Sequence, residues 1–126
     1  MDKVKKYKKP IIIGAILLFL IVYMGIKTDS KSNALTLILD FGNGSKKAFY
    51  NYDQGEKSAW SVLQQVAAVS KIDLQAGPGF IPKKIDGRVN GEENKKWELY
   101  VNGMKQISSP VDIKVSIPDK IIYKFE

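Results

Sequence analysis

Cysteine and histidine are both absent from this chain of 126 residues. Without cysteine, the chain forms no disulfide bond, has no thiol nucleophile and carries no acylated cysteine of the lipoprotein type. Without histidine, it lacks the commonest general base near neutral pH, and with it histidine-dependent triads and most zinc sites. Both absences argue against an enzyme and against a bound metal. The length fits one small domain.

Carboxylates are the remaining candidates for catalysis, and four of them lie close together in the sequence: Asp86, Glu92, Glu93 and Glu98. A catalytic carboxylate pair needs apposed positions and pKa values that the surroundings split apart. Lysine and arginine are interspersed among these four, which is more typical of a solvated charged surface. A weak calcium site here lacks the spacing of a calcium loop. We therefore predict no catalytic residue, no metal ligand and no enzyme, with an acid–base site as the minor alternative.

The net charge of +7 at first points to an acidic partner. Its distribution argues otherwise, because five lysines and one aspartate precede residue 11, while residues 33–126 hold 13 basic and 11 acidic side chains. A nucleic-acid footprint needs lysine and arginine gathered on one face of the folded domain. We predict no nucleic-acid partner.

An uncharged, almost wholly apolar run of 16 residues extends from Ile11 to Ile26. As a helix it is about 24 Å long, which is short for a hydrocarbon core of about 30 Å, but flanking lysines can snorkel. Five lysines precede the run and two follow it, which places the N-terminus in the cytoplasm. The sequence therefore predicts four parts: a cytoplasmic basic tail (1–10), a single transmembrane anchor in the cell membrane (11–26), a spacer (27–33) and an extracytoplasmic domain (34–126).

A cleaved signal peptide is the alternative for this segment, since both kinds of segment combine a basic start with an apolar run. The following residues have no Ala-x-Ala-like cleavage site, and Ser30-x-Ser32 is a poor substitute. We favour the uncleaved anchor. Both interpretations place residues 34–126 outside the cytoplasm.

The first part of the domain alternates apolar and polar residues, which predicts a strand with one buried face: Leu35, Leu37, Leu39 and Phe41. The "GNGS" after it tolerates positive φ, so this strand forms a hairpin with "KKAFYNY". A helix over 59–70 follows, with Ser58 as its N-cap. Apolar residues at three- and four-residue spacing form its buried face, with Trp60 on that face or at its rim: Val62, Leu63, Val66 and Val69.

The second part of the domain reads as short strands. "KIDLQAGPG" holds one strand and a turn, and "FIPKKI" is an edge strand because Pro82 cannot donate to a ladder. "KWELYV" and "MKQI" flank Asn102-Gly103, a type I′ turn signal. "DKIIYKFE" ends the chain as a strand with alternate residues buried. The order of hairpin, helix and strands predicts an α+β fold, one helix packed across a mixed sheet, which is the order of a β-grasp domain.

The stretch from Gly79 to Gly103 holds two apolar runs, which we interpret as a strand pair of the core. Trp97 and Leu99 share one face of their strand, under the helix, while Glu98 and Tyr100 point to the other face. An aromatic residue on an otherwise polar sheet face is a mild indication of binding.

The run "GPGFIPKKIDGRVNGEENKKWELYVNG", followed by "DKIIYKF", resembles the small β-domain at the C-terminus of transcobalamin and intrinsic factor. Stand-alone domains of this family occur in prokaryotic surface proteins. The shared pattern is Gly79-Phe80, then Ile85-Asp86-Gly87, a variable loop, Trp97-x-Leu99 and a final Asp119-x-Ile121 strand. The opening "LTLILDFGNG" and the "YVNG" also look like the prokaryotic members. The resemblance covers nearly all of residues 34–126.

The resemblance implies a β-grasp-like fold, no catalysis and no cofactor beyond a corrinoid as bound ligand. By similarity, the residues nearest such a ligand are Gly79, Phe80, Trp97, Glu98 and Leu99, and the strand's Tyr100 joins them as a candidate. The large helical domain that completes the site in the animal carriers is absent, so a protein partner is expected to cover the ligand. We therefore predict a membrane-anchored, non-catalytic binding module for a corrinoid or similar flat small molecule. The alternative is a surface protein–protein interaction or structural module that acts by strand addition or through a flat patch.

Overall fold

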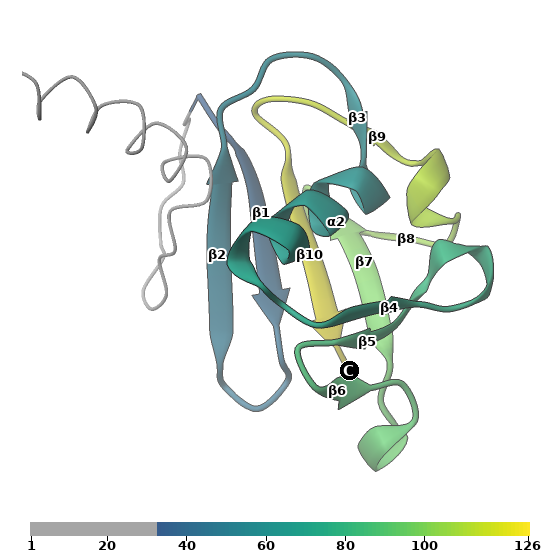
Figure 1. The fold of residues 1–126 in the computed structure, drawn as a ribbon. Coiled ribbons are helices and arrows are strands. Elements are labelled where there is room, and N and C mark those ends of the chain that lie inside the picture. Colours follow the sequence, from purple (N-terminus) through teal and green to yellow (C-terminus); the bar gives the residue numbers. More distant parts are fainter. Residues whose placement is uncertain (1–32) are drawn as a thin grey trace, which may run out of the picture.

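The computed structural model of the chain describes residues 33–126 (Figure 1). The predicted tail, the predicted anchor and all of the predicted spacer except its last residue lie outside this range. From residue 33 to the C-terminus, no helix is long and apolar enough to cross a membrane.

The main sheet has five strands, and it is mixed as the sequence predicts (Figure 1). In order across the sheet they are β2 (Lys46–Asn51), β1 (Leu35–Asp40), β10 (Lys120–Phe125), β7 (Trp97–Val101) and β8 (Met104–Gln106). The first and last strands of the domain, β1 and β10, lie side by side in parallel, and the other neighbours are antiparallel. The C-terminal strand β10 therefore occupies the centre of the sheet.

The predicted hairpin of β1 and β2 is confirmed. Its turn begins at Asp40, whose carboxylate accepts a hydrogen bond of 3.0 Å from the backbone N–H of Gly42. The side chain of Asn43 accepts from Ser45 in the same way, at 3.0 Å. Gly42 has a φ of 75°, which glycine adopts without strain.

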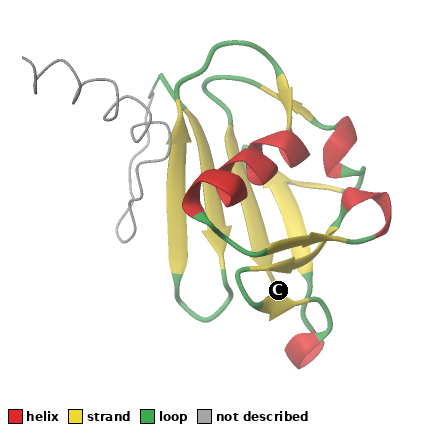
Figure 2. Ribbon diagram, viewed as in Figure 1, coloured by secondary structure: helices red, strands yellow, loops and turns green. Residues whose placement is uncertain are grey.

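The single α-helix of the described residues, α2 (Ala59–Ser70), crosses one face of this sheet (Figure 2). Ser58 caps it as predicted, because its hydroxyl oxygen accepts a hydrogen bond of 3.0 Å from the N–H of Ser61. The buried side chains of the helix are Ala59, Trp60, Val62, Leu63, Val66 and Ala67. The prediction for Val69 is wrong, since its side chain is 52% exposed. The spacing of Val69 matches the buried face, but Ala67 is the last buried residue of the helix, which ends at Ser70.

A second, three-stranded sheet packs beside the helix over the same face: β4 (Leu74–Ala76), β5 (Pro82–Ile85) and β6 (Arg88–Val89). The predicted edge position of β5 is wrong, because β5 is the central strand. Pro82 is its first residue and lies opposite Ala76, where the register with β4 shifts. A missing N–H at the first position of a strand leaves the rest of the ladder intact.

The two apolar runs between Gly79 and Gly103 do not form the strand pair that the sequence suggests. The first becomes β5, which pairs with β4 and β6, and the second becomes β7, which pairs with β10 and β8. They belong to different sheets, and a pocket opens between their first residues.

The β7–β8 hairpin has the predicted type I′ turn, with φ of 51° at Asn102 and 86° at Gly103. Smaller elements complete the fold and were not anticipated from the sequence: a two-stranded ladder of β3 (Lys57–Ser58) with β9 (Lys114–Val115), and 3-10 turns η1 (Pro78–Phe80), η2 (Glu92–Asn94) and η3 (Pro110–Asp112). The prediction of an α+β fold with one packed helix is confirmed.

The hydrophobic core lies between the main sheet and the layer formed by α2 and the second sheet. It includes the predicted inward residues of β1 and the alternate residues of β10: Ile121, Tyr123 and Phe125. The sequence left open whether Trp60 lies on the buried face of the helix or at its rim. In the structure it is 7% exposed and belongs to the core.

Candidate ligand pocket at the start of strand β7

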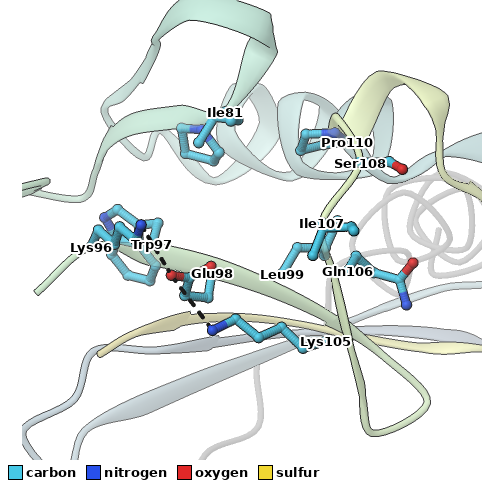
Figure 3. Close-up of a pocket in the computed structure, with 11 residues that line it drawn as sticks. Ile81, Lys96, Trp97, Glu98, Leu99, Lys105, Gln106, Ile107, Ser108 and Pro110 are labelled. Carbon is cyan, nitrogen blue, oxygen red and sulfur yellow. Dashed lines mark ion pairs between the residues drawn. The ribbon is translucent and has the colours of Figure 1, made fainter.

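A pocket of about 350 Å³ opens where β7 begins and β8 has ended (Figure 3). One wall comes from Ile81 and Pro82 at the start of β5, and the opposite wall from the first residues of β7. The chain after β8 closes the third side. The full lining is Ile81, Pro82, Lys96, Trp97, Glu98, Leu99, Lys105, Gln106, Ile107, Ser108 and Pro110.

Trp97 and Leu99 belong to the wall formed by β7, and both are almost fully buried, at 2% and 5% exposure. The Trp97 ring lies 5.1 Å from the ring of Phe125 and 5.7 Å from that of Phe41, centroid to centroid. Its indole N–H donates a hydrogen bond of 3.0 Å to the carbonyl of Arg88 in β6. Trp97 is therefore held in place by the carbonyl of Arg88 in β6 and by the rings of Phe41 and Phe125.

The rim of the pocket is apolar and exposed. Ile81 is 45% exposed and Ile107, just after β8, is 95% exposed. Complete burial of such a side chain is worth about 1.5–3 kcal/mol, so a molecule that covers both gains binding free energy from them. The pocket thus combines a buried wall at β7 with a rim that still has apolar surface to bury.

Three of the residues that line the pocket are charged, and their side chains pair with one another. The Glu98 carboxylate is 3.7 Å from the ammonium of Lys96 and 3.8 Å from that of Lys105. Both distances exceed those of good hydrogen bonds, so these are loose ion pairs between partly exposed groups. Glu98 alternates with Trp97 and Leu99 along β7, so its side chain, which is 17% exposed, lies with that of Tyr100 on the opposite face of the main sheet.

Gly79 and Phe80 lie next to the pocket and do not line it. The carbonyl of Gly79 accepts a hydrogen bond of 2.5 Å from the hydroxyl of Ser109, which ties η1 to the chain before η3. The Phe80 ring is 49% exposed and lies 5.7 Å from the ring of Trp60. Phe80 also has a φ of 60°, which is uncommon for a bulky residue. The turn therefore shapes the approach to the wall at Ile81.

Tyr100 does not contribute to the pocket. Its side chain is on the opposite face of the main sheet, and its hydroxyl donates a hydrogen bond to the carboxylate of Glu126. This bond to the carboxylate raises the pKa of Tyr100 above its usual value. Of the six site residues predicted from the sequence, the structure brings Trp97, Glu98 and Leu99 together in one pocket.

Sequence reasoning missed the other walls of the pocket. Ile107 and Pro110 follow a short hairpin and show no periodic pattern that would mark them. Asn90 was missed as well, because Asn90-Gly91 reads only as a turn, and its side chain contacts two strands, β5 and β7, that are not paired with each other.

No family model matches the chain, and no curated protein matches it. A crystal structure of a protein from Ruminococcus gnavus ATCC 29149, described as a "putative metal binding protein", is similar in fold with a TM-score of 0.58. It is 16% identical and covers 75% of this chain and 97% of its own. At this identity the likeness concerns the fold alone.

Over residues 33–126, no group of three or more carboxylates, histidines and cysteines is placed to hold a metal ion. The loop carboxylates are paired with cations instead, as at Glu93, whose oxygens lie 3.6 Å from Arg88 and 3.5 Å from Lys95. The donor set of the described residues does not fit a metal site.

Proposed function

We propose that this protein is a membrane-anchored, extracytoplasmic and non-catalytic binding module, whose pocket at the start of β7 holds part of a flat, largely apolar small molecule such as a corrinoid. The observation that carries this proposal is the pocket itself. Trp97, Glu98 and Leu99 line it, and these are three of the residues that the resemblance to the transcobalamin C-terminal domain singles out.

The size and chemistry of the pocket support partial enclosure of a ligand. A volume of about 350 Å³ is at the lower end of small-molecule sites, so a larger planar molecule would project from it. The exposed Ile107 would pack on one face of such a molecule. A second extracytoplasmic protein would then cover the other face, since a half-open site gives modest affinity by itself.

The topology supports the assignment to a β-grasp-like domain of the transcobalamin family. A β1–β2 hairpin, a crossing helix and a final strand parallel to β1 at the centre of the sheet are the arrangement that such domains have. The membrane anchor rests on the apolar run of residues 11–26 and the lysines around it.

The alternative, a protein interaction module without a ligand, is favoured by the exposure of Ile107 at 95%. Strand addition at the start of β7, where the ladder with β8 has not yet begun, is disfavoured because loop atoms occupy that side. The backbone N–H of Gly91 donates to the carbonyl of Lys95 at 2.8 Å, and the side chain of Asn90 accepts from the N–H of Trp97 at 2.8 Å. A peptide strand would have to displace both.

The test is calorimetric titration of the full chain in lipid nanodiscs with cyanocobalamin, cobinamide and haemin. We expect saturable, micromolar binding of at least one of them. Ile107→Asp should weaken binding at least tenfold, because it places a charge where the ligand packs. Val69→Asp is the matched control, an exposed valine on α2 that does not line the pocket, and it should bind normally.

Absence of heat for all three compounds with a folded protein would remove the ligand from the proposal. The interaction module would then be tested by cross-linking from position 107 in intact cells. Equal affinity in Ile107→Asp and the native chain would show binding elsewhere on the protein.

A further inference from the structure

The side chain of Asn90 bridges the two walls of the pocket. Its amide nitrogen donates a hydrogen bond of 2.9 Å to the carbonyl of Pro82, and its oxygen accepts one of 2.8 Å from the backbone N–H of Trp97. The carbonyl can only accept and the N–H can only donate, so the chemistry fixes the orientation of the amide group. Pro82 begins β5 and Trp97 begins β7, two strands of different sheets with no ladder between them.

Asn90 takes the place of a missing strand partner at Trp97. Lys96 and Glu126 exchange two backbone hydrogen bonds, of 2.9 and 3.0 Å, so the next N–H along β7 points away from β10. On that side the ladder with β8 starts only at Leu99. The N–H of Trp97 would therefore face the pocket unpaired if the Asn90 side chain were not there.

Asn90 is itself fixed to the wall formed by β5. Its backbone N–H donates a hydrogen bond of 2.9 Å to the carbonyl of Lys83, and it follows directly on β6. The side chain is half-buried, so its hydrogen bonds are partly shielded from competition by water. The second sheet thus reaches β7 through a short side chain with little freedom to move.

We infer that Asn90 is a positioning residue that sets the separation of the two pocket walls and thereby the affinity for the ligand. The inference about affinity rests on the proposed function of the pocket, whereas the bridge between Pro82 and Trp97 can be tested without any ligand. Asparagine suits this role because its amide presents one donor and one acceptor to partners of opposite kind.

Asn90→Asp is the informative variant, since it keeps the shape of the side chain. The carboxylate still accepts from the N–H of Trp97, but it has no proton to donate and its negative charge faces the carbonyl oxygen of Pro82. Once protonated, the carboxyl group regains an O–H donor. The defect of this variant should therefore be present at pH 7 and be reversed as pH falls through the pKa of the new carboxyl, whereas Asn90→Ala has no group to restore.

Charged groups near residue 90 influence the pKa of the carboxyl group that Asn90→Asp introduces, and so the pH range of the recovery. A shallow hollow on the far side of Asn90 is lined by Lys95, Lys96 and Glu126. The lysines favour the charged carboxylate and Glu126 opposes it, and the backbone of β6 adds the carbonyl of Arg88. Asn94→Asp, in the same loop and lining the same hollow, is the matched control for the change in charge.

The experiment uses the full chain in lipid nanodiscs and two readouts, the hydrogen-exchange protection of the Trp97 amide without ligand and the affinity for cyanocobalamin. At pH 7 we expect Asn90→Asp and Asn90→Ala to lower the protection factor of Trp97 about tenfold, which corresponds to the net contribution of one hydrogen bond, and to weaken binding by a similar factor. Between pH 7 and pH 4, Asn90→Asp should regain both, relative to the native chain at each pH. Asn94→Asp should match the native chain throughout.

Unchanged protection of Trp97 in both Asn90 variants would overturn the inference, whether or not a ligand binds. Recovery of protection in Asn90→Asp at pH 4 without recovery of affinity would also overturn it, because wall position would then not control binding. If the native chain binds no cyanocobalamin but the protection changes as expected, the bridge is supported and the proposed ligand is wrong.

Discussion

The hydroxyl of Tyr123, in the central strand β10, donates a hydrogen bond of 3.0 Å to the carbonyl of Ala59 in the first turn of α2. Both residues are fully buried, and they are 64 positions apart in the chain. This bond connects the helix to the middle of the main sheet. Because burial disfavours the charged phenolate, it raises the pKa of Tyr123 well above the ordinary value of 10.0.

The raised pKa of Tyr123 predicts alkaline destabilisation. Below pH 10 the tyrosine is protonated in both the folded and the unfolded chain, so its contribution to stability is complete. Above pH 10 only the unfolded chain releases the proton, so the free energy of unfolding should fall by about 1.4 kcal/mol per pH unit from this residue. Urea unfolding at pH 8, 10 and 11 measures this slope, and Tyr123→Phe should be less steep while losing about 1 kcal/mol at pH 8. Equal slopes for the two proteins would contradict the prediction.

A pair of glycines in the first hairpin predicts unequal effects of the same substitution. A Cβ at Gly42 would clash with the backbone carbonyl oxygen of Phe125, whereas a Cβ at Gly44 would meet nothing within 4 Å. Both residues have positive φ, so both alanine variants pay for backbone strain, of about 1–2 kcal/mol. Gly42→Ala should be further destabilised because β10 must shift. Chemical denaturation of the two variants would measure this difference. An equal decrease in the free energy of unfolding would mean that the end of β10 can shift at no cost.

Removal of the hydroxyl group of Ser58, which caps α2, should cause a moderate loss of stability. Ser58→Ala leaves the N–H of Ser61 without its partner and should lower the free energy of unfolding by about 1 kcal/mol. Ser58→Asp should restore most of it, because a carboxylate also accepts this hydrogen bond and interacts favourably with the helix N-terminus. Thermal unfolding of the three proteins would test the order, and a loss that Ser58→Asp does not recover would point to another role of the hydroxyl.

Substitutions at two pocket residues, Trp97 and Ile107, should differ strongly in their effect on the free energy of unfolding. Trp97→Ala empties a site at the centre of an aromatic cluster and should cost about 3–5 kcal/mol, a large share of the stability of a small domain. Ile107→Ser removes an exposed side chain and should change stability by no more than about 0.5 kcal/mol. Unfolding curves for both variants would show which of them stays folded and is therefore suitable for measuring ligand binding. If Trp97→Ala is well tolerated, the ring contributes to the site more than to the core.

Local sequence signals predicted the elements that depend on neighbouring residues. The alternation in β1, the periodicity of α2 with its cap at Ser58, and the positive φ of Asn102 and Gly103 were all visible, because backbone preferences and side-chain spacing act within a few residues. The same signals misplaced Val69, since periodicity identifies a helix face but not how far the opposing layer extends.

The candidate site was predictable only in part. Trp97, Glu98 and Leu99 were singled out through a resemblance to a family, and they meet in one pocket. The exposed rim at Ile107 and the amide bridge of Asn90 were not predicted, because each depends on which strands lie next to each other in space.

The sequence by itself determined an α+β domain with one amphipathic helix, an N-terminal apolar run and no histidine or cysteine chemistry. The tertiary structure decided that β5 and β7 lie in different sheets and that a pocket opens between their first residues. The physical reason is that strand partners are chosen by long-range hydrogen bonds and shared burial. Pro82 could therefore begin a central strand, and a turn asparagine could become the link between two walls.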